Sequence, residues 1–148
     1  MLVRNVLERR GRRPVQTIEH SEPVEAAIKR LAVATFRSLL VVDAGALVGI
    51  VTVRDLLRFL AERGARGLQA RVREAMTPEP ATVSPADPLD RVRSILIDRR
   101  VNHVPVVDGR SVIDVLTEAD VLGEHLDDVR AFSDDLQRYI MGHHVVPG

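Results

Sequence analysis

The 148-residue sequence contains no cysteine, which excludes disulfide bonds, thiol nucleophiles and thiolate metal sites. Aromatic residues make up only 3% of it, too few for the stacking platforms that bind single-stranded nucleic acid. Its 21 basic and 21 acidic side chains cancel, so it lacks the basic field that nucleic-acid or membrane-surface binding requires. No apolar run approaches the ~20 residues that span a bilayer, and the N-terminus lacks the apolar core of a signal peptide. We therefore expect a cytoplasmic protein without nucleic-acid or membrane partners.

What the sequence does contain is an internal repeat with an offset of 65 residues. The motif Thr52-x-x-Asp55 recurs as Thr117-x-x-Asp120, and the offset needs no gap from residue 17 to residue 57. A period of this length is too long for a solenoid and is typical of a duplicated supersecondary unit. The same offset pairs Thr17 with Thr82, Pro23 with Pro88, Leu31 with Leu96, Val41-Val42-Asp43 with Val106-Val107-Asp108, and Leu57 with Leu122.

Hydrophobic periodicity and turn residues predict the order strand, helix, two hairpin strands and helix in each copy. Runs that are apolar on both faces need cover on both sides, and the obvious cover is the other copy's sheet. The predicted fold class is therefore α+β, with two pseudo-symmetric β-α-β-β-α motifs packed sheet to sheet. The first copy has predicted strands at Val15–Ile18, Leu39–Val42 and Leu47–Val51, and the second at Val104–Val107 and Val112–Ile113.

The domain organisation follows from the repeat. We place repeat one at about residues 10–63, a linker at 64–76 and repeat two at about 77–126, so that residues 1–126 form one paired module. A short helix is predicted within residues 3–13, and a C-terminal helix and tail occupy 127–148. The C-terminal stripe either docks on its own module or pairs with the same helix of a second chain. The stripe consists of Leu122, Leu126, Val129, Leu136 and Ile140.

The chemistry of the repeated motif suggests an anion and sugar site. A strand that ends at Thr52 and turns into a helix leaves backbone N–H groups free, and these groups and the helix dipole both favour negative charge. The Thr52 hydroxyl can donate to a phosphate oxygen, and the Asp55 carboxylate can accept from the two hydroxyls of a ribose. The simpler alternative is a helix cap with an acidic residue in the first turn. That alternative is favoured for a single copy, and the duplication shifts the balance towards a site.

Two other polar clusters have simpler explanations. The basic stretch Arg9, Arg10, Arg12 and Arg13 is either a patch for an acidic partner or a ligand phosphate, or a solvated helix end that suits the helix dipole. The sequence favours the solvated end. His143 and His144 have no nearby carboxylates, so no metal site is predicted there.

In combination, these motifs resemble the cystathionine-beta-synthase (CBS) domain family in its tandem form, the Bateman module. The resemblance covers roughly residues 1–126 and leaves the C-terminal helix outside. No enzyme, channel or DNA-binding domain is recognisable beside it, so the chain resembles a free-standing pair. The residues that carry the resemblance are Val41-Val42-Asp43, Gly49–Asp55, Met76-Thr77-Pro78, Thr82-Val83 and His103–Asp108.

The resemblance implies clefts between the repeats that bind an adenosine-containing ligand: AMP, ADP, ATP or S-adenosylmethionine. It also implies a homodimer and an effector protein, which the sequence does not identify. In the family pattern, the motif Asp accepts from the ribose and the motif Thr meets a phosphate, while the strand starts and the segments before the hairpins frame the base. The candidate ligand-binding residues are Thr52, Arg54, Asp55, Thr17, Ile18, Ser38 and Leu39 with repeat one, and Thr117, Asp120, Thr82, Val83, His103, Val104 and Pro105 with repeat two.

One residue departs from the family pattern. The family usually has a small residue where the last strand nears the ligand; Gly49 keeps it in the first copy, but the second copy has Asp114. If the Asp114 side chain points into the cleft, it obstructs backbone approach and repels phosphate by ~1 kcal/mol or more. Strand alternation can instead point it outward. The sequence therefore favours the Thr52/Asp55 site over the Thr117/Asp120 site for phosphorylated ligands.

Three functions are weighed on this basis. The leading hypothesis is a regulatory module that senses an adenosine-containing ligand and signals to a partner protein by a conformational shift. The alternative is a structural dimerisation module without a ligand. An enzyme is disfavoured because the sequence has no Gly-x-Ser-x-Gly elbow, no Gly-rich phosphate loop and no His-Glu-x-x-His motif.

Overall fold

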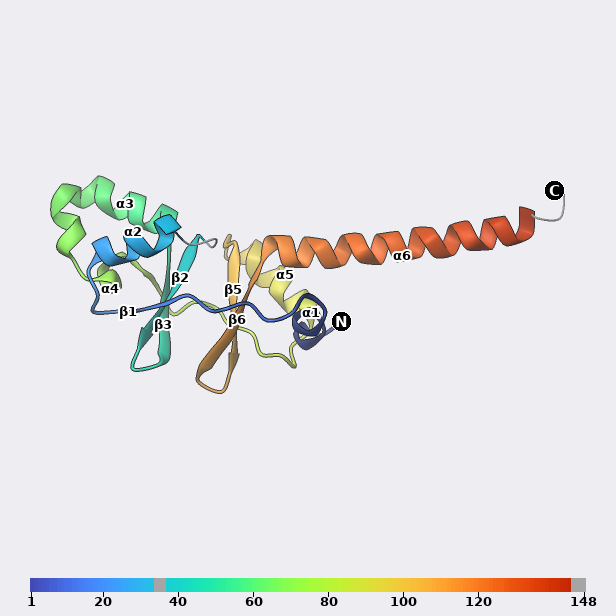
Figure 1. The fold of residues 1–148 in the computed structure, drawn as a ribbon, viewed down its shortest axis with the longest axis horizontal. Coiled ribbons are helices and arrows are strands. Elements are labelled where there is room, and N and C mark those ends of the chain that lie inside the picture. The colour runs from blue at the N-terminus through green and yellow to red at the C-terminus, as the bar shows by residue number, and fades with distance from the viewer. Residues whose placement is uncertain (34–36, 145–148) are drawn as a thin grey trace.

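The computed structural model describes residues 1–33 and 37–144, without the side chains of residues 124–132 and 141–144. Figure 1 shows two small β/α units side by side, with one long helix extending from the second. The elements are α1 (Val3–Arg10), β1 (Thr17–Glu19), α2 (Val24–Val33), β2 (Ser38–Asp43), β3 (Ala46–Thr52), α3 (Val53–Arg63), the 3-10 helix η1 (Gly64–Gln69), α4 (Val72–Ala75), β4 (Thr77–Pro78), α5 (Leu89–Asp98), β5 (His103–Asp108), β6 (Ser111–Thr117) and α6 (Glu118–His144).

The first repeat contains a four-stranded sheet in the order β1-β2-β3-β4, with β1 parallel to β2 and the other pairs antiparallel. The hairpin turn between β2 and β3 is closed by Ala44 and Gly45, both at positive φ, as the Asp-Ala-Gly sequence favours. The predicted strand order and the helix after Thr52 are confirmed. A register shift follows Val41 in the first hairpin and recurs after Val106 in the second, at the same offset of 65 residues.

In the second repeat, a single parallel β-bridge between Val83 and Val106 stands in place of the first strand. In the first repeat, Leu40 donates its N–H to Gln16 and His20 donates to Val42, at 2.9 and 3.0 Å. The residues at the positions of Leu40 and His20 in the second repeat are Pro105 and Pro85, which have no N–H to donate. Two ladder bonds are therefore lost, and the predicted pair Thr82-Val83 starts no regular strand.

Each repeat has its own apolar core. Ile18, Leu39, Val41 and Val51 from the first sheet pack with α2 and α3, and the second core holds the corresponding residues Val83, Val104, Val106 and Leu116. On the opposite face of β2, the side chains of Leu40 and Val42 are also buried, at 1% and 9% exposure, without belonging to either core. β3 contacts β6, so this opposite face is covered by the second repeat. Sheet-to-sheet packing is confirmed.

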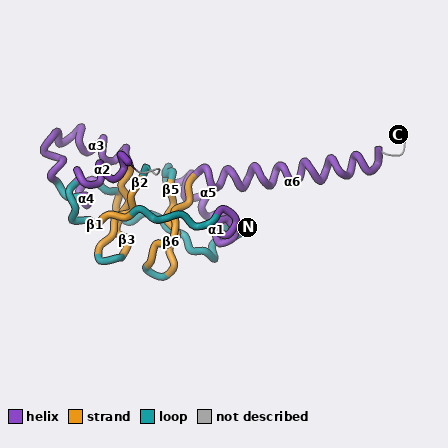
Figure 2. The backbone as a smooth tube through the Cα atoms, in the orientation of Figure 1, coloured by secondary structure: helices purple, strands orange, loops and turns teal. Residues whose placement is uncertain are grey.

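The short helix that precedes each repeat in the sequence packs into the core of the other repeat. α1 contributes Val3, Val6 and Leu7 to the second core, and α4 contributes Val72 to the first. The two junctions match: Val3 donates its N–H to Asp87 at 2.9 Å, and Val72 donates to Glu22 at 2.8 Å. Residues 11–16 therefore leave α1 on the second repeat and run across to β1 on the first, as the loop in Figure 2 shows.

The helix α6 begins on the second repeat and then extends away from it (Figure 1). Leu136 and Ile140 are 48% and 42% exposed. Docking of this part of the stripe on its own module is therefore wrong, because the helix runs straight past the end of the small second sheet. The side chains of Leu126 and Val129 and the tail 145–148 lie outside the described residues. Among the helices that the structure describes, none is long and apolar enough to cross a membrane.

Candidate functional site

Both copies of the Thr-x-x-Asp motif form reciprocal helix caps. Asp55 donates its backbone N–H to the Thr52 Oγ1 at 3.1 Å, and the Thr52 N–H donates to the Asp55 Oδ2 at 3.0 Å. In the second copy the matching distances are 3.3 Å and 2.9 Å, between Thr117 and Asp120. The capping interpretation thus holds at both sites. Each cap uses only one of the two aspartate oxygens, so the cap leaves the other oxygen able to accept a further hydrogen bond.

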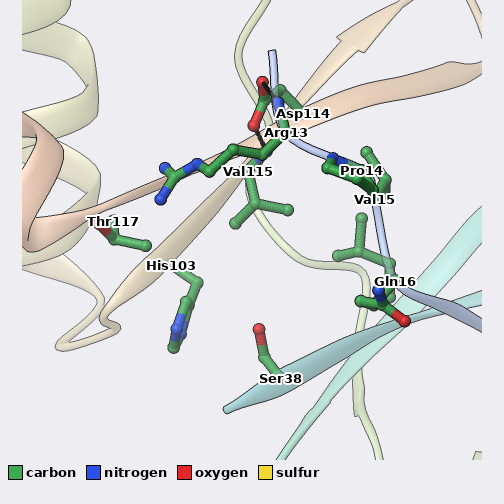
Figure 3. Close-up of a pocket in the computed structure, with 10 residues that line it drawn as sticks. Arg13, Pro14, Val15, Gln16, Ser38, His103, Asp114, Val115 and Thr117 are labelled. Carbon is green, nitrogen blue, oxygen red and sulfur yellow. Dashed lines mark hydrogen bonds between the residues drawn. The ribbon is translucent and has the colours of Figure 1, made fainter. Parts of the chain in front are cut away.

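A cleft lies between the repeats and takes residues from both, with about 350 Å³ of empty space when its open side is counted. Only about 20 Å³ of this space admits the centre of a water molecule, which is room for about one water. Three of the predicted site residues, Ser38, His103 and Thr117, line it together. Figure 3 shows their side chains with the loop before β1 passing over them. The complete lining is Arg13, Pro14, Val15, Gln16, Ser38, Leu40, His103, Asp114, Val115 and Thr117.

Cross-strand pairing explains why these residues meet. Ser38 lies opposite Thr52 in the first hairpin, and His103 lies opposite Thr117 in the second. Each motif Thr therefore has the first residue of its own hairpin as a neighbour. Since the two hairpins face each other, Ser38 of one repeat reaches the cleft that contains Thr117 of the other.

Several other predicted residues point away from the cleft. The side chains of Ile18, Leu39, Val83 and Val104 are at most 1% exposed and lie in the two repeat cores. Only their backbone groups could meet a ligand. Strand alternation places their neighbours on the opposite face, and Leu40 lines the cleft. Of the remaining candidates, Thr17 and Arg54 are exposed, Thr82 is half-buried and Pro105 is buried.

Burial lowers the pKa of His103 below its ordinary value of 6.5, because a charged imidazole loses solvation between the two repeats. The ring is therefore neutral at neutral pH. A neutral imidazole offers one donor and one acceptor, which suits contact with a heterocyclic base better than contact with a phosphate.

Asp114 is 2% exposed and is held by arginine. Arg10, the last residue of α1, donates from Nη2 to Oδ1 at 2.8 Å and from Nη1 to Oδ2 at 3.3 Å. Arg10 also donates to the Val115 carbonyl at 3.1 Å, and the Arg13 backbone N–H lies 3.4 Å from Oδ2. The carboxylate therefore lines the cleft, but its charge is paired with arginine. The sequence analysis considered a side chain that points into the cleft and one that points outward, and it did not consider this pairing.

Arg13 extends the same network to the motif aspartate. Its Nη2 lies 2.6 Å from Asp120 Oδ2, and Arg10 Nε lies 3.4 Å from Asp120 Oδ1. Figure 3 shows the Arg13 side chain running from the loop towards Thr117. The favoured prediction of a solvated basic helix end is therefore wrong for Arg10 and Arg13. Arg10 is only 17% exposed, because two acidic residues from the second repeat lie within its reach.

Among the described residues of the first repeat, no equivalent network occurs. The residue at the position of Asp114 is Gly49, and β4 passes directly over it. A methyl group at Gly49 would overlap the sulfur of Met76 and lie 2.9 Å from the Thr77 carbonyl oxygen. Among the residues that the structure describes, Asp55 hydrogen-bonds only with Thr52.

Of the four motif residues, Thr117 is the one that lines the cleft, and the sequence analysis missed the loop before β1. Pro14, Val15 and Gln16 line the cleft, and their only sequence signal is their place just before the first strand of the repeat. For metals, no cluster of three His, Asp or Glu side chains occurs in the described part of the chain. The side chains of His143 and His144 lie outside that part.

Comparison with known proteins gives consistent matches. The family model described as CBS domain matches residues 3–62 and 72–127. A mitochondrial CBS domain-containing protein of Arabidopsis thaliana is 30% identical over 126 residues, which are 82% of this chain and 61% of that protein. The inosine-5′-monophosphate dehydrogenase of Nitrosopumilus maritimus is 30% identical over 127 residues, 85% of this chain but only 25% of the enzyme. The chain thus spans about three fifths of the first relative and a quarter of the second.

Solved structures agree on the fold. A CBS-domain protein of Agrobacterium tumefaciens is 29% identical with a TM-score of 0.77, covering 84% of this chain and 99% of that one. CBSX2, solved in complex with AMP, is 25% identical with a TM-score of 0.70, covering 85% and 96%. A CBS domain pair solved with 5′-methylthioadenosine and S-adenosylmethionine is 27% identical with a TM-score of 0.71, covering 86% and 98%.

Proposed function

The chain belongs to the CBS domain family, and from that premise we propose that it is a regulatory module that binds an adenosine-containing ligand between its repeats. The observation that carries the proposal is the cleft that brings Ser38, His103 and Thr117 together from two repeats. The proposal is supported by two similar structures, one solved with AMP and one with S-adenosylmethionine and 5′-methylthioadenosine.

In the proposed binding mode, the motif aspartates accept hydrogen bonds from the ribose hydroxyls. Asp55 and Asp120 each keep one carboxylate oxygen outside the cap, and a carboxylate accepts strongly from hydroxyl donors. The first-turn N–H groups of α3 and α6 and the side chains of Thr52 and Thr117 lie at the phosphate end. His103 and the backbone of β1 and β5 frame the base.

We propose that ligand binding is read out as a change in packing between the repeats. A ligand that contacts both hairpins shifts their arrangement only by its different affinity for the two arrangements. An effector protein, which the fold alone does not identify, would respond to that shift. A catalytic role is not proposed, and the match to the dehydrogenase, which covers only a quarter of that enzyme, supports this view.

Isothermal titration with AMP, ADP, ATP and S-adenosylmethionine tests the proposal. Asp55→Ala combined with Asp120→Ala should abolish binding. The matched control is Asp87→Ala, because Asp87 also caps a turn by accepting the Ser84 N–H at 2.8 Å but lies outside both Thr-x-x-Asp motifs. Absence of binding by the folded wild-type protein would refute the sensor and leave the structural module.

The structural module has one observation in its favour, the caps at both motifs, which account for the Thr and Asp residues without any ligand. The two readings differ in what the double aspartate variant changes. A pure cap loses only stability, by about 0.5–2 kcal/mol at Asp55 and by more at Asp120, which also pairs with Arg13. A sensor loses stability and ligand affinity together, and Asp87→Ala separates the two effects.

We further propose that the module forms a homodimer through its helices. Each of four helices exposes an apolar side chain: Val33, Leu57, Ile97 and Leu122 are 88%, 64%, 73% and 54% exposed. Ile97 and Leu122 line the same open hollow between α5 and α6, and exposed apolar surface is typical of an interaction face. Light scattering should report a dimer that Ile97→Glu with Leu122→Glu converts to monomer. A monomeric wild-type protein at micromolar concentration would contradict it.

A further inference from the structure

We call the cleft lined by Asp114 and Thr117 the second cleft, and the corresponding site at Thr52 and Asp55 the first cleft. The second cleft contains a network of four charged side chains that differ in how tightly the fold holds them. Arg10 and Arg13 face Asp114 and Asp120, so the formal charges cancel. The carboxylates are 3% and 10% exposed, whereas the Arg13 side chain is 34% exposed. Two buried carboxylates require paired cations, because an unpaired buried charge is strongly unfavourable. Any ligand that enters this cleft must therefore keep the charges balanced.

The fold fixes Arg10 and leaves Arg13 on a loop. Arg10 ends α1, whose residues Val3, Val6 and Leu7 are at most 4% exposed in the second core. Arg13 lies in the segment between α1 and β1, which has no regular secondary structure. The Arg13 side chain is also the more exposed of the two, at 34% against 17% for Arg10, so Arg13 has more room to reorient.

Arg13 pairs with the carboxylate that is proposed to receive the ribose. Its Nη2 is 2.6 Å from Asp120 Oδ2, the oxygen that also accepts the Thr117 N–H, while Oδ1 lies 3.4 Å from Arg10 Nε. A ribose is uncharged, so a ribose that competes with Arg13 for this carboxylate cannot replace the carboxylate as the counter-ion of the guanidinium. The displaced cation then needs another anion close by.

This inference rests on the proposed function. We propose that Arg13 is a specificity-determining residue, which guards Asp120 in the empty cleft and becomes a phosphate ligand when a nucleotide binds. Arg10 instead neutralises the charge of Asp114. The second cleft therefore selects adenosine ligands with a phosphate over uncharged adenosine and over the sulfonium of S-adenosylmethionine, whose positive charge would meet the released guanidinium.

The structure thereby changes the argument from the sequence about Asp114. Considered alone, the carboxylate repels phosphate and favours the first cleft. With Arg10 bound to it in a two-bond contact, its charge is cancelled, and Arg13 supplies a cation that the first cleft lacks at that place. The residue 65 positions after Arg13 is Pro78, which pairs with Gly49 in the first sheet and carries no charge.

The test uses the full chain with Asp55→Ala as background, so that only the second cleft binds. Titration calorimetry compares AMP with adenosine for this background and for Arg13→Gln, Arg13→Lys and Arg12→Gln added to it. Arg12 is an exposed neighbour outside the network and gives the same charge change. We expect the background to prefer AMP, and Arg13→Gln to weaken AMP at least about tenfold without weakening adenosine, as loss of a charge-assisted bond implies. Arg13→Lys should keep most of the preference, and Arg12→Gln should keep all of it.

Each other outcome overturns the proposal. Arg13→Gln could retain the AMP preference, weaken AMP and adenosine equally, or fail to fold; the last two would make Arg13 a structural ion. If wild-type protein binds AMP and the Asp55→Ala background does not, the ligand occupies the first cleft alone, and the proposed function survives. If wild-type protein binds no adenosine ligand, both proposals fail.

Discussion

Removing the Arg10 side chain should destabilise the protein far more than removing an arginine from a surface ion pair of the same length. Arg10→Met keeps an unbranched apolar stem but leaves Asp114, 3% exposed, without its cation. Breaking a buried pair on one side costs about 3–5 kcal/mol, because the remaining charge stays desolvated. At about 2–4 °C per kcal/mol for a chain of this size, the melting temperature should fall by roughly 10 °C.

The chain supplies the matched control. Arg93 and Asp90 approach to 2.7 Å, as closely as Arg10 and Asp114, but Asp90 is 83% exposed. Exposed pairs contribute about 0–1 kcal/mol, so Arg93→Met should leave stability almost unchanged. The closest distances are nearly equal in this comparison, 2.8 and 2.7 Å, while the carboxylates differ greatly in burial.

Urea unfolding followed by circular dichroism measures both effects. The double variant Arg10→Met with Asp114→Ala should recover most of the loss, because it removes both charges together. The reasoning is refuted if Arg10→Met costs no more than Arg93→Met, or if adding Asp114→Ala makes the protein still less stable. Either result would mean that solvent already screens Asp114.

Three further changes test the fold around the cleft. Gly49→Ala should cost about 1–3 kcal/mol in unfolding free energy, because the added methyl group meets Met76 and comes within 2.9 Å of the Thr77 carbonyl oxygen; unchanged stability would show that β4 can lift away. Because burial lowers the pKa of His103, the unfolded chain binds a proton at His103 at higher pH than the folded chain does. The contribution of neutral His103 to stability should therefore be fully present above about pH 6.5 and be lost as the pH falls below it. His103→Gln should flatten this slope in melting curves from pH 7.5 to 5, and an unaltered slope would assign it elsewhere. Thr52→Ala removes the acceptor for the Asp55 N–H and should cost about 1 kcal/mol by urea unfolding, while a neutral effect would show that the cap is dispensable.

The fold was predictable wherever local pattern and duplication agreed. The hairpins and the helices after Thr52 and Thr117 follow from apolar runs, turn residues and caps, which act over a few residues. The shortened first strand of repeat two was equally available from Pro85 and Pro105, since a missing N–H can be read from sequence. The association of α1 with the second core was harder to predict, because it joins Val3 to residues more than 80 positions away.

The site was predictable only in part, for a related reason. Thr-x-x-Asp at a strand-to-helix turn is a local signal, so Thr52, Asp55, Thr117 and Asp120 could be named. The contact between Arg10 and Asp114 spans 104 residues, and no periodicity in the sequence links the two. The charge of Asp114 was visible in the sequence, and its neutralisation was visible only in the fold.

The two repeats agree where they build the scaffold and differ where they face the cleft. Caps, hairpin irregularities and core positions recur at an offset of 65 residues, so both motif aspartates are presented by the same geometry. The differences, Asp114 for Gly49 and Arg13 for Pro78, lie on the strand edge and the segment that passes over it. Together with His103 in place of Ser38 and the shortened first strand of repeat two, these side chains are where a difference in affinity between the clefts should arise. If the proposal about Arg13 is correct, the two clefts respond to ligands of different charge, and exchanging Arg13 and Asp114 for the residues of the first repeat should remove that difference.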